Sequence, residues 1–136
     1  MSRMESIFYR LTGVAGRHNR SLVEVRDWLA TLEKFLRTYG LWGEDADLQG
    51  LLKSSGDAKF DLTGIAYKGR GMVARAREIM DGGVVEQVSG MLKNVEKIRR
   101  YLMNPALQAV NLLESFTALR EYYQTLHEAL ENIEYL

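Results

Sequence analysis

Hydrophobic residues in the last third of the chain recur at alternating steps of three and four. They are Ala109, Leu112, Phe116, Leu119, Tyr123, Leu126, Leu130 and Ile133. Because residues three and four apart share one face of an α-helix, this pattern predicts one long amphipathic helix over residues 105–135. Pro105 suits the first turn of that helix, since a proline lacks the N–H that would find no partner there, and Asn104 is its expected cap.

A second stripe with the same steps comes just before it. Its members are Val84, Val88, Met91, Val95, Ile98 and Leu102. The stripe predicts a helix over residues 84–103 that closes at Asn104. Because the connection to the next helix is short, the two helices are expected to fold back on each other as an antiparallel hairpin, 84–103 against 105–135.

The N-terminal part of the chain predicts three further helices. A weak one covers residues 4–16 and is followed by a polar connector, 17–20. A stronger one covers residues 21–39, with Ser21 and Glu24 as a capping box and Gly40 as its stop. A short one surrounds Leu48, Leu51 and Leu52.

The segment 57–71 breaks this regularity. Three glycines, Gly64, Gly69 and Gly71, interrupt its apolar residues, and each glycine weakens a helix by about 1 kcal/mol relative to alanine. We therefore expect an irregular, glycine-containing basic loop over 57–71, with a helix resuming near Met72. Together these patterns predict an all-α fold: a single domain, 1–136, that forms a bundle of about five helices.

Composition narrows the classes of function. The chain has no cysteine, which excludes disulfides, thiolate metal sites and thiol catalysis, and fits a cytoplasmic protein. No apolar run reaches the roughly 18 residues of a membrane span, so no membrane partner is expected.

Motifs for catalysis, cofactors or metals are weak. His127 lies near Glu128, Glu131 and Glu134, but a solvated acidic helix face with a surface histidine explains this group better than a divalent-metal site does. The run Gly69–Ala74 matches a dinucleotide-binding fingerprint in letters only, because a helical hairpin follows it where strand–helix–strand units are required. We therefore predict no enzyme activity, no cofactor and no metal.

Charge is distributed unevenly along the chain, although the formal net charge is zero. Residues 59–100 carry nine basic and five acidic side chains. Helical spacing places Lys93, Lys97 and Arg100 on one face as a basic ridge. Tyr67 or Tyr101 is suited to stack on a base. The candidate phosphate-binding residues are Lys68, Arg70, Arg75, Arg77, Lys93, Lys97 and Arg100. The alternative is that these cations pack beside acidic neighbours such as Glu96.

The last helix is expected to have more apolar surface than the shorter helices cover. This favours a non-enzymatic interaction or assembly subunit that buries a helical face against a partner, either a second copy or another protein. The expected interface residues are Leu119, Tyr123, Leu126, Leu130 and Ile133. The alternative function is a small helical subunit of a nucleoprotein complex that binds RNA or DNA backbone.

Overall fold

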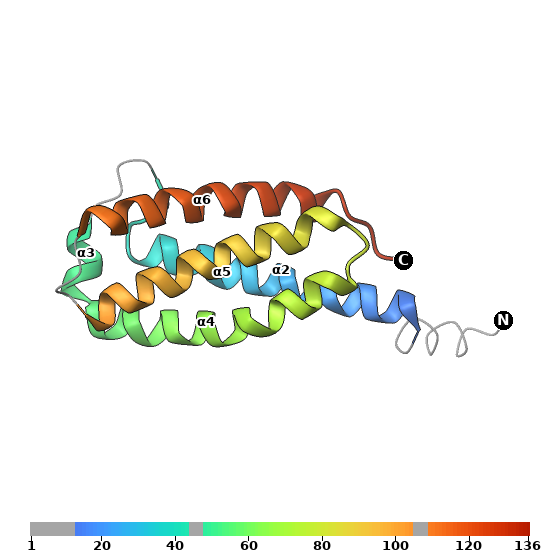
Figure 1. The fold of residues 1–136 in the computed structure, drawn as a ribbon, viewed down its shortest axis with the longest axis horizontal. Helices are drawn as coiled ribbons and strands as arrows, with labels where there is room; N and C mark the ends of the chain where they lie inside the picture. Colours follow the sequence, from blue (N-terminus) through green and yellow to red (C-terminus); the bar gives the residue numbers. More distant parts are fainter. Residues whose placement is uncertain (1–12, 44–47, 105–108) are drawn as a thin grey trace.

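The computed structural model describes residues 13–43, 48–104 and 109–136, and the described part is helical with no strand. The helices are α2 (Val14–Thr38), α3 (Leu48–Lys53), α4 (Ser55–Glu78), α5 (Gly82–Met103) and α6 (Ala109–Glu131). Figure 1 shows the four long helices side by side, with the short α3 at one end. The predicted all-α bundle is confirmed.

The four long helices form a ring in which each runs antiparallel to the next. α2 packs on α4, α4 on α5 and α5 on α6, while α2 and α6 close the ring with less extensive packing. In the described residues α4 does not contact α6, so these two helices lie diagonally across the bundle. The predicted hairpin is present as α5 and α6. The predicted start of the second helix at Pro105 lies outside the described residues, and α6 ends at Glu131 rather than at residue 135.

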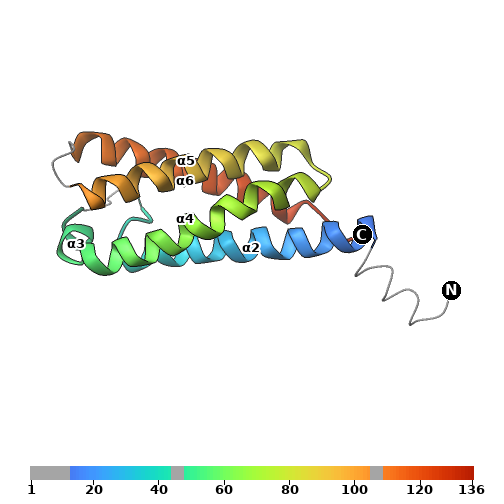
Figure 2. The same ribbon diagram turned by 60° about the horizontal axis from the view of Figure 1, so that its bottom comes forward.

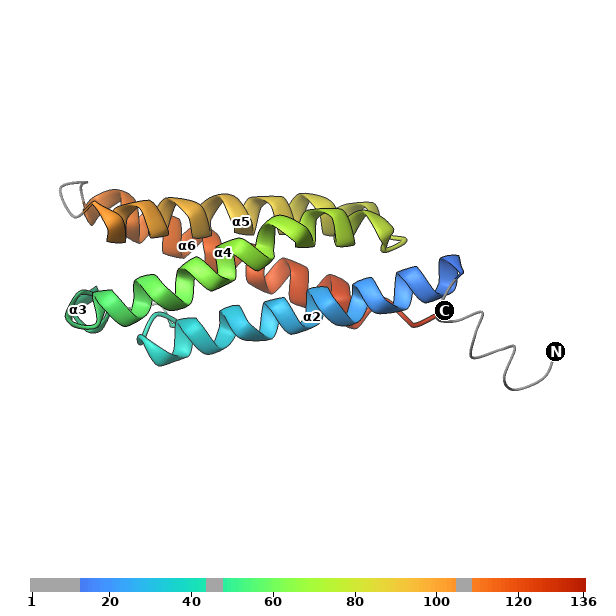
Figure 3. The same cartoon turned by 90° about the horizontal axis from the view of Figure 1, so that it is seen from below.

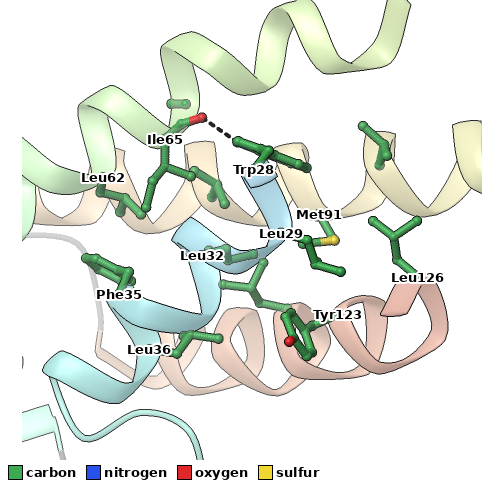
Figure 4. Packing of buried hydrophobic residues seen from close by; sticks show 14 of the residues in the cluster. Trp28, Leu29, Leu32, Phe35, Leu36, Leu62, Ile65, Met91, Tyr123 and Leu126 are labelled. Carbon is green, nitrogen blue, oxygen red and sulfur yellow. Dashed lines mark hydrogen bonds between the residues drawn. The ribbon is translucent and has the colours of Figure 1, made fainter. Parts of the chain in front are cut away.

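The core lies inside this ring and draws on every long helix. Figure 4 shows Trp28, Leu29 and Leu32 of α2 lying against residues of the other three helices. The indole N–H of Trp28 donates a hydrogen bond of 3.0 Å to the backbone carbonyl of Ile65, which satisfies the one polar atom of a large buried side chain. None of the described helices is long and apolar enough to cross a membrane.

The start of α2 differs from the prediction. Residues 17–20 are helical, because Ala15, Gly16 and His18 are buried and extend the stripe of α2 towards its N-terminus. Ser21 is therefore inside the helix and does not cap it; its hydroxyl donates a 2.8 Å hydrogen bond to Glu78 of α4. Most of the predicted helix 4–16 lies outside the described residues. The predicted stop is confirmed, since Gly40 has a φ of +68°.

The predicted irregular loop at 57–71 is wrong, because these residues belong to α4. Tertiary packing outweighs the low helix propensity of the glycines. Six of the seven buried positions of α4 recur at steps of four and three: Ala58, Leu62, Ile65, Gly69, Met72 and Ala76, with Ala66 beside them. Gly69 is part of this stripe for a steric reason, since a Cβ there would lie 2.8 Å from both the Trp28 ring and the Leu92 side chain.

Candidate interaction surface

The predicted interface on the last helix lies inside the protein. Leu119, Tyr123, Leu126 and Leu130 are buried, and Ile133 is half-buried just beyond the end of α6. Figure 4 shows Tyr123 and Leu126 directed into the core that α2 and α5 also fill. The stripe is apolar as predicted, but the other helices of the same chain cover it. We therefore correct the prediction: these side chains form core, not an exposed face for a partner.

The outward face of α4 is the largest departure from a normal solvent-facing helix. We call it the α4 strip: Gly56, Phe60, Thr63, Gly64, Tyr67, Gly71 and Ala74, all exposed. Phe60 is 81% exposed and Tyr67 is 77% exposed. An outward helix face is usually charged, whereas no member of this strip carries a charge. α4 is thus apolar or small on two opposite faces, one of which lies in the core.

The surroundings of α4 leave this strip open except at Thr63, whose hydroxyl accepts a 3.2 Å hydrogen bond from the Arg99 guanidinium of α5. Figure 3, which views the bundle from the α4 side, shows α4 crossing in front with no other described helix over its near face. α2 and α5 flank α4 on its two sides, and α6 lies diagonally behind it. α4 is therefore a corner helix, and the strip runs along the outside of that corner for about 27 Å at 1.5 Å per residue.

The glycines of α4 fall into two groups. Gly69 faces the core and has no room for a Cβ. At Gly56, Gly64 and Gly71, by contrast, a Cβ would meet nothing within 4 Å. Packing within the described chain therefore explains Gly69 but not the three exposed glycines. Each of those three weakens the helix by about 1 kcal/mol relative to alanine without a compensating contact in the described residues.

The predicted phosphate-binding cations are all exposed, but they are not equally available. Arg70 forms a 3.1 Å ion pair with Glu96 of α5. Arg75 contacts Glu24 at 3.0 Å and Glu78 at 3.6 Å. In the described residues, no ion pair engages the other five: Lys68, Arg77, Lys93, Lys97 and Arg100. The basic surface is therefore real but partly neutralised by acidic neighbours, as the alternative interpretation expected for Glu96.

A half-open groove of about 240 Å³ lies where α2 and α6 pack loosely. It is lined by Arg26, Leu29, Ala30, Glu33, Tyr123, His127, Leu130 and Glu131. The His127 ring stacks on Tyr123 with centroids 5.7 Å apart, and its Nε2 lies 3.3 Å from Glu131. Burial, together with the nearby carboxylate of Glu33, raises the pKa of Tyr123 to about 12. The phenol therefore stays protonated near neutral pH, where it can donate a hydrogen bond but not act as a base.

This geometry does not support a metal site at His127. Across the described parts of the chain, no three His, Cys, Asp or Glu side chains gather in a way that could hold an ion. His127 instead sits on the exposed side of α6 beside one carboxylate. The described groove is thus a shallow, mixed surface without a convergent set of ligands.

Hydrogen bonds from side chains of α2 hold the end of α6 and the residues that follow it, the C-terminal tail. The Arg26 guanidinium donates to the carbonyls of Leu130 at 2.6 Å and Ile133 at 3.1 Å. Buried His18 accepts a 3.3 Å bond from the Met80 N–H at Nδ1, so its Nε2 carries the proton donated to the Glu134 carbonyl at 3.0 Å. Figure 2 shows the tail reaching the start of α2. Sequence patterns missed this role because a hydrogen bond to a backbone carbonyl needs no matching residue type.

The comparisons with known proteins do not place this chain in a family. No protein-family model matches the chain, and neither the search of curated proteins nor the search of solved structures found a match. What the chain does therefore has to follow from its own surfaces, of which the α4 strip departs furthest from an ordinary solvated helix face.

Proposed function

We propose that this protein is a non-enzymatic helical interaction protein, an assembly or accessory subunit that docks a protein partner through the α4 strip. The observation that carries the proposal is the exposure of Phe60 and Tyr67, at 81% and 77%, on one uncharged helix face. Aromatic side chains are enriched at protein interfaces, where tyrosine in particular supplies much of the binding energy. The cytoplasm stays the expected compartment, an expectation that rests on the cysteine-free composition.

The exposed glycines support the same proposal from a second direction. A sequence that breaks a local rule without a gain inside its own fold commonly does so at a functional site. Here the rule is helix propensity, and Gly56, Gly64 and Gly71 break it on the same face that carries the two aromatics. A partner backbone can approach the helix more closely at a glycine than at any other residue. The neighbouring aromatic rings then have more contact with the partner.

Site-specific photocrosslinking tests this proposal directly. Tyr67 is replaced by p-benzoylphenylalanine in cells that make the protein, and Thr125 on the exposed side of α6 serves as the matched control position. We expect irradiation to give a discrete crosslinked protein from position 67, with the same product from position 60 and none from position 125. Equal products from all three positions, or no product from 60 and 67, would overturn the proposal.

Nucleic-acid binding is the second candidate, and the five exposed cations without an ion pair in the described residues favour it. Anisotropy of labelled single-stranded RNA and DNA, at low and moderate salt, measures it. If these cations hold a phosphate backbone, a Lys97→Glu/Arg100→Glu variant loses affinity and its salt dependence becomes flatter. If wild type does not bind even at low salt, the basic ridge has no role in nucleic-acid recognition.

A further inference from the structure

We infer that the partner of the α4 strip is a second copy of this chain, with the two α4 helices packed antiparallel about a two-fold axis near Thr63 and Gly64. This inference rests on the proposed function, because it names the occupant of the same docking surface. In a two-fold interface the same patch is used on both sides, so that residue i of one copy meets residue j of the other and the reverse. A surface built for this purpose must be complementary to itself.

The α4 strip has the symmetry that such an interface needs. About the peptide that joins Thr63 to Gly64, Phe60 is the mirror position of Tyr67, and Gly56 is the mirror position of Gly71. Two antiparallel copies centred there place each Phe60 level with the Tyr67 of the other chain. Aromatic rings at this level pack on each side of the axis, and the small residue Gly64 lies at the crossing, where the helices come closest.

The charges on the α2-facing side of the strip are also complementary to themselves, whereas the other side carries Lys59, Arg70 and Arg77. On the margin of α4 that faces α2, the N-terminal half carries Asp57 and Asp61, and the C-terminal half carries Lys68 and Arg75. Two of these groups are engaged within the chain, since Asp61 accepts a 2.9 Å hydrogen bond from Tyr39 and Arg75 pairs with Glu24 and Glu78. In the described residues no ion pair engages Asp57 or Lys68. An antiparallel two-fold brings this margin of one helix against the same margin of the other. The acidic half then lies opposite the basic half, and Asp57 is nearly level with Lys68 of the second copy.

Other partners fit this surface less well. A nucleic acid would meet the carboxylates of Asp57 and Asp61, which repel phosphates, beside the aromatic rings that would stack on its bases. A uniformly acidic helix would meet the same two carboxylates. The α2-facing margin therefore opposes both, whereas a second antiparallel copy matches Asp57 with Lys68.

The corner position of α4 makes this arrangement sterically accessible. Because α6 lies diagonally behind α4, the outward face of α4 projects from the described bundle. Phe60 can therefore meet Tyr67 of the second copy, and Gly64 can meet the residues at the crossing, before the flanking helices of the two copies approach each other.

A charge exchange tests the antiparallel register. Asp57 and Lys68 are eleven residues apart on one helix, about 16 Å, so they cannot contact each other within a chain. We expect Asp57→Lys and Lys68→Asp each to raise the dimer dissociation constant about tenfold, through the loss of two symmetric pairs and the gain of repulsion. The double variant Asp57→Lys/Lys68→Asp restores dimerisation. Sedimentation equilibrium measures all four proteins, and failure of the double variant to recover would overturn the register.

Cysteine crosslinking tests the position of the axis, since the chain has no cysteine of its own. Under mild oxidation we expect Gly64→Cys to form a disulfide-linked dimer much faster than Thr125→Cys, because only residues near the axis meet their own counterparts. Equal rates would overturn the proposed axis.

The outcomes separate this inference from the proposed function. A wild-type protein that stays monomeric at every concentration overturns self-association. If position 67 then photocrosslinks to a different protein, docking through the α4 strip stands and only the identity of its occupant changes. If position 67 crosslinks to nothing, both proposals fail.

Discussion

α4 and α6 each carry a phenylalanine followed seven residues later by a tyrosine, and the two pairs have opposite surroundings. Phe116 and Tyr123 of α6 are 1% and 6% exposed. Phe60 and Tyr67 of α4 are 81% and 77% exposed. Residue type and spacing are the same, so neither decides whether an aromatic pair enters the core. The difference is that Phe116 and Tyr123 belong to the buried stripe of their helix, while Phe60 and Tyr67 lie on the face opposite the stripe.

This contrast separates two uses of aromatic residues. The pair on α6 stabilises the fold, because its rings fill space that other helices enclose. The pair on α4 makes no such contribution in the described structure, and we propose that it serves association instead. The variants below test that separation, beginning with the largest expected effect.

Truncation of the aromatics should give the largest difference. Phe116→Ala leaves a cavity in the core and is expected to lower the free energy of unfolding by about 3–5 kcal/mol. Phe60→Ala, measured on dilute protein, should change it by less than about 0.5 kcal/mol, as for other exposed positions. Urea denaturation followed by circular dichroism measures both. A loss of stability in Phe60→Ala comparable to that in Phe116→Ala would remove the distinction.

Alanine substitutions at the glycines should have smaller effects of opposite sign. Gly69→Ala forces a Cβ against Trp28 and Leu92 and should cost about 1–3 kcal/mol, the usual penalty for overpacking. Gly64→Ala meets open space and should stabilise the isolated chain by about 0.5–1 kcal/mol, since alanine favours the helix. Thermal unfolding at low protein concentration compares the two. If Gly64→Ala destabilises the isolated chain, the glycine has a role in the fold.

Deprotonation of two buried tyrosines, Tyr39 and Tyr123, should lower the folding stability only at high pH. Burial raises the pKa of Tyr39 to about 12, helped by its 2.9 Å hydrogen bond to Asp61, and the pKa of Tyr123 is also raised to about 12. The unfolded value is 10.0, so between pH 10 and 12 the folded state keeps protons that the unfolded state loses. The contribution of these two tyrosines to the free energy of unfolding is therefore constant below this window, and it is lost as the pH rises through it. Ultraviolet titration of wild type against Tyr39→Phe and Tyr123→Phe checks this, and an unchanged high-pH phase in both variants would contradict it.

Sequence patterns predicted the helices whose buried positions hold large side chains. The stripes of α5 and α6 are built from valine, leucine, isoleucine and aromatic residues, and both helices are where these residues indicate. The part of α4 before Met72 was missed because Ala58, Ala66, Gly69 and Ala76 are four of the seven buried positions of the helix. Gly69 allows Trp28 to approach the helix closely. In the sequence, however, glycine indicates a break in a helix and alanine adds little to an apolar stripe.

The surfaces were harder to predict than the helices, for a related reason. A stripe shows which face of a helix is apolar but not whether the same chain covers that face. For α6 the bundle covers it, so the predicted interface became core. For α4 the sequence showed Phe60 and Tyr67 without showing that they oppose the buried stripe, because that stripe had not been recognised.

The most direct test of the central claim is sedimentation equilibrium of wild type and Phe60→Ser/Tyr67→Ser, combined with urea denaturation of both at low concentration. If the two aromatics serve self-association, wild type forms a concentration-dependent dimer, whereas the variant is a monomer with an unfolding free energy close to that of the wild-type chain. The same oligomeric state for both proteins, or a variant that loses its fold, would contradict the claim that these two aromatics serve association and not folding.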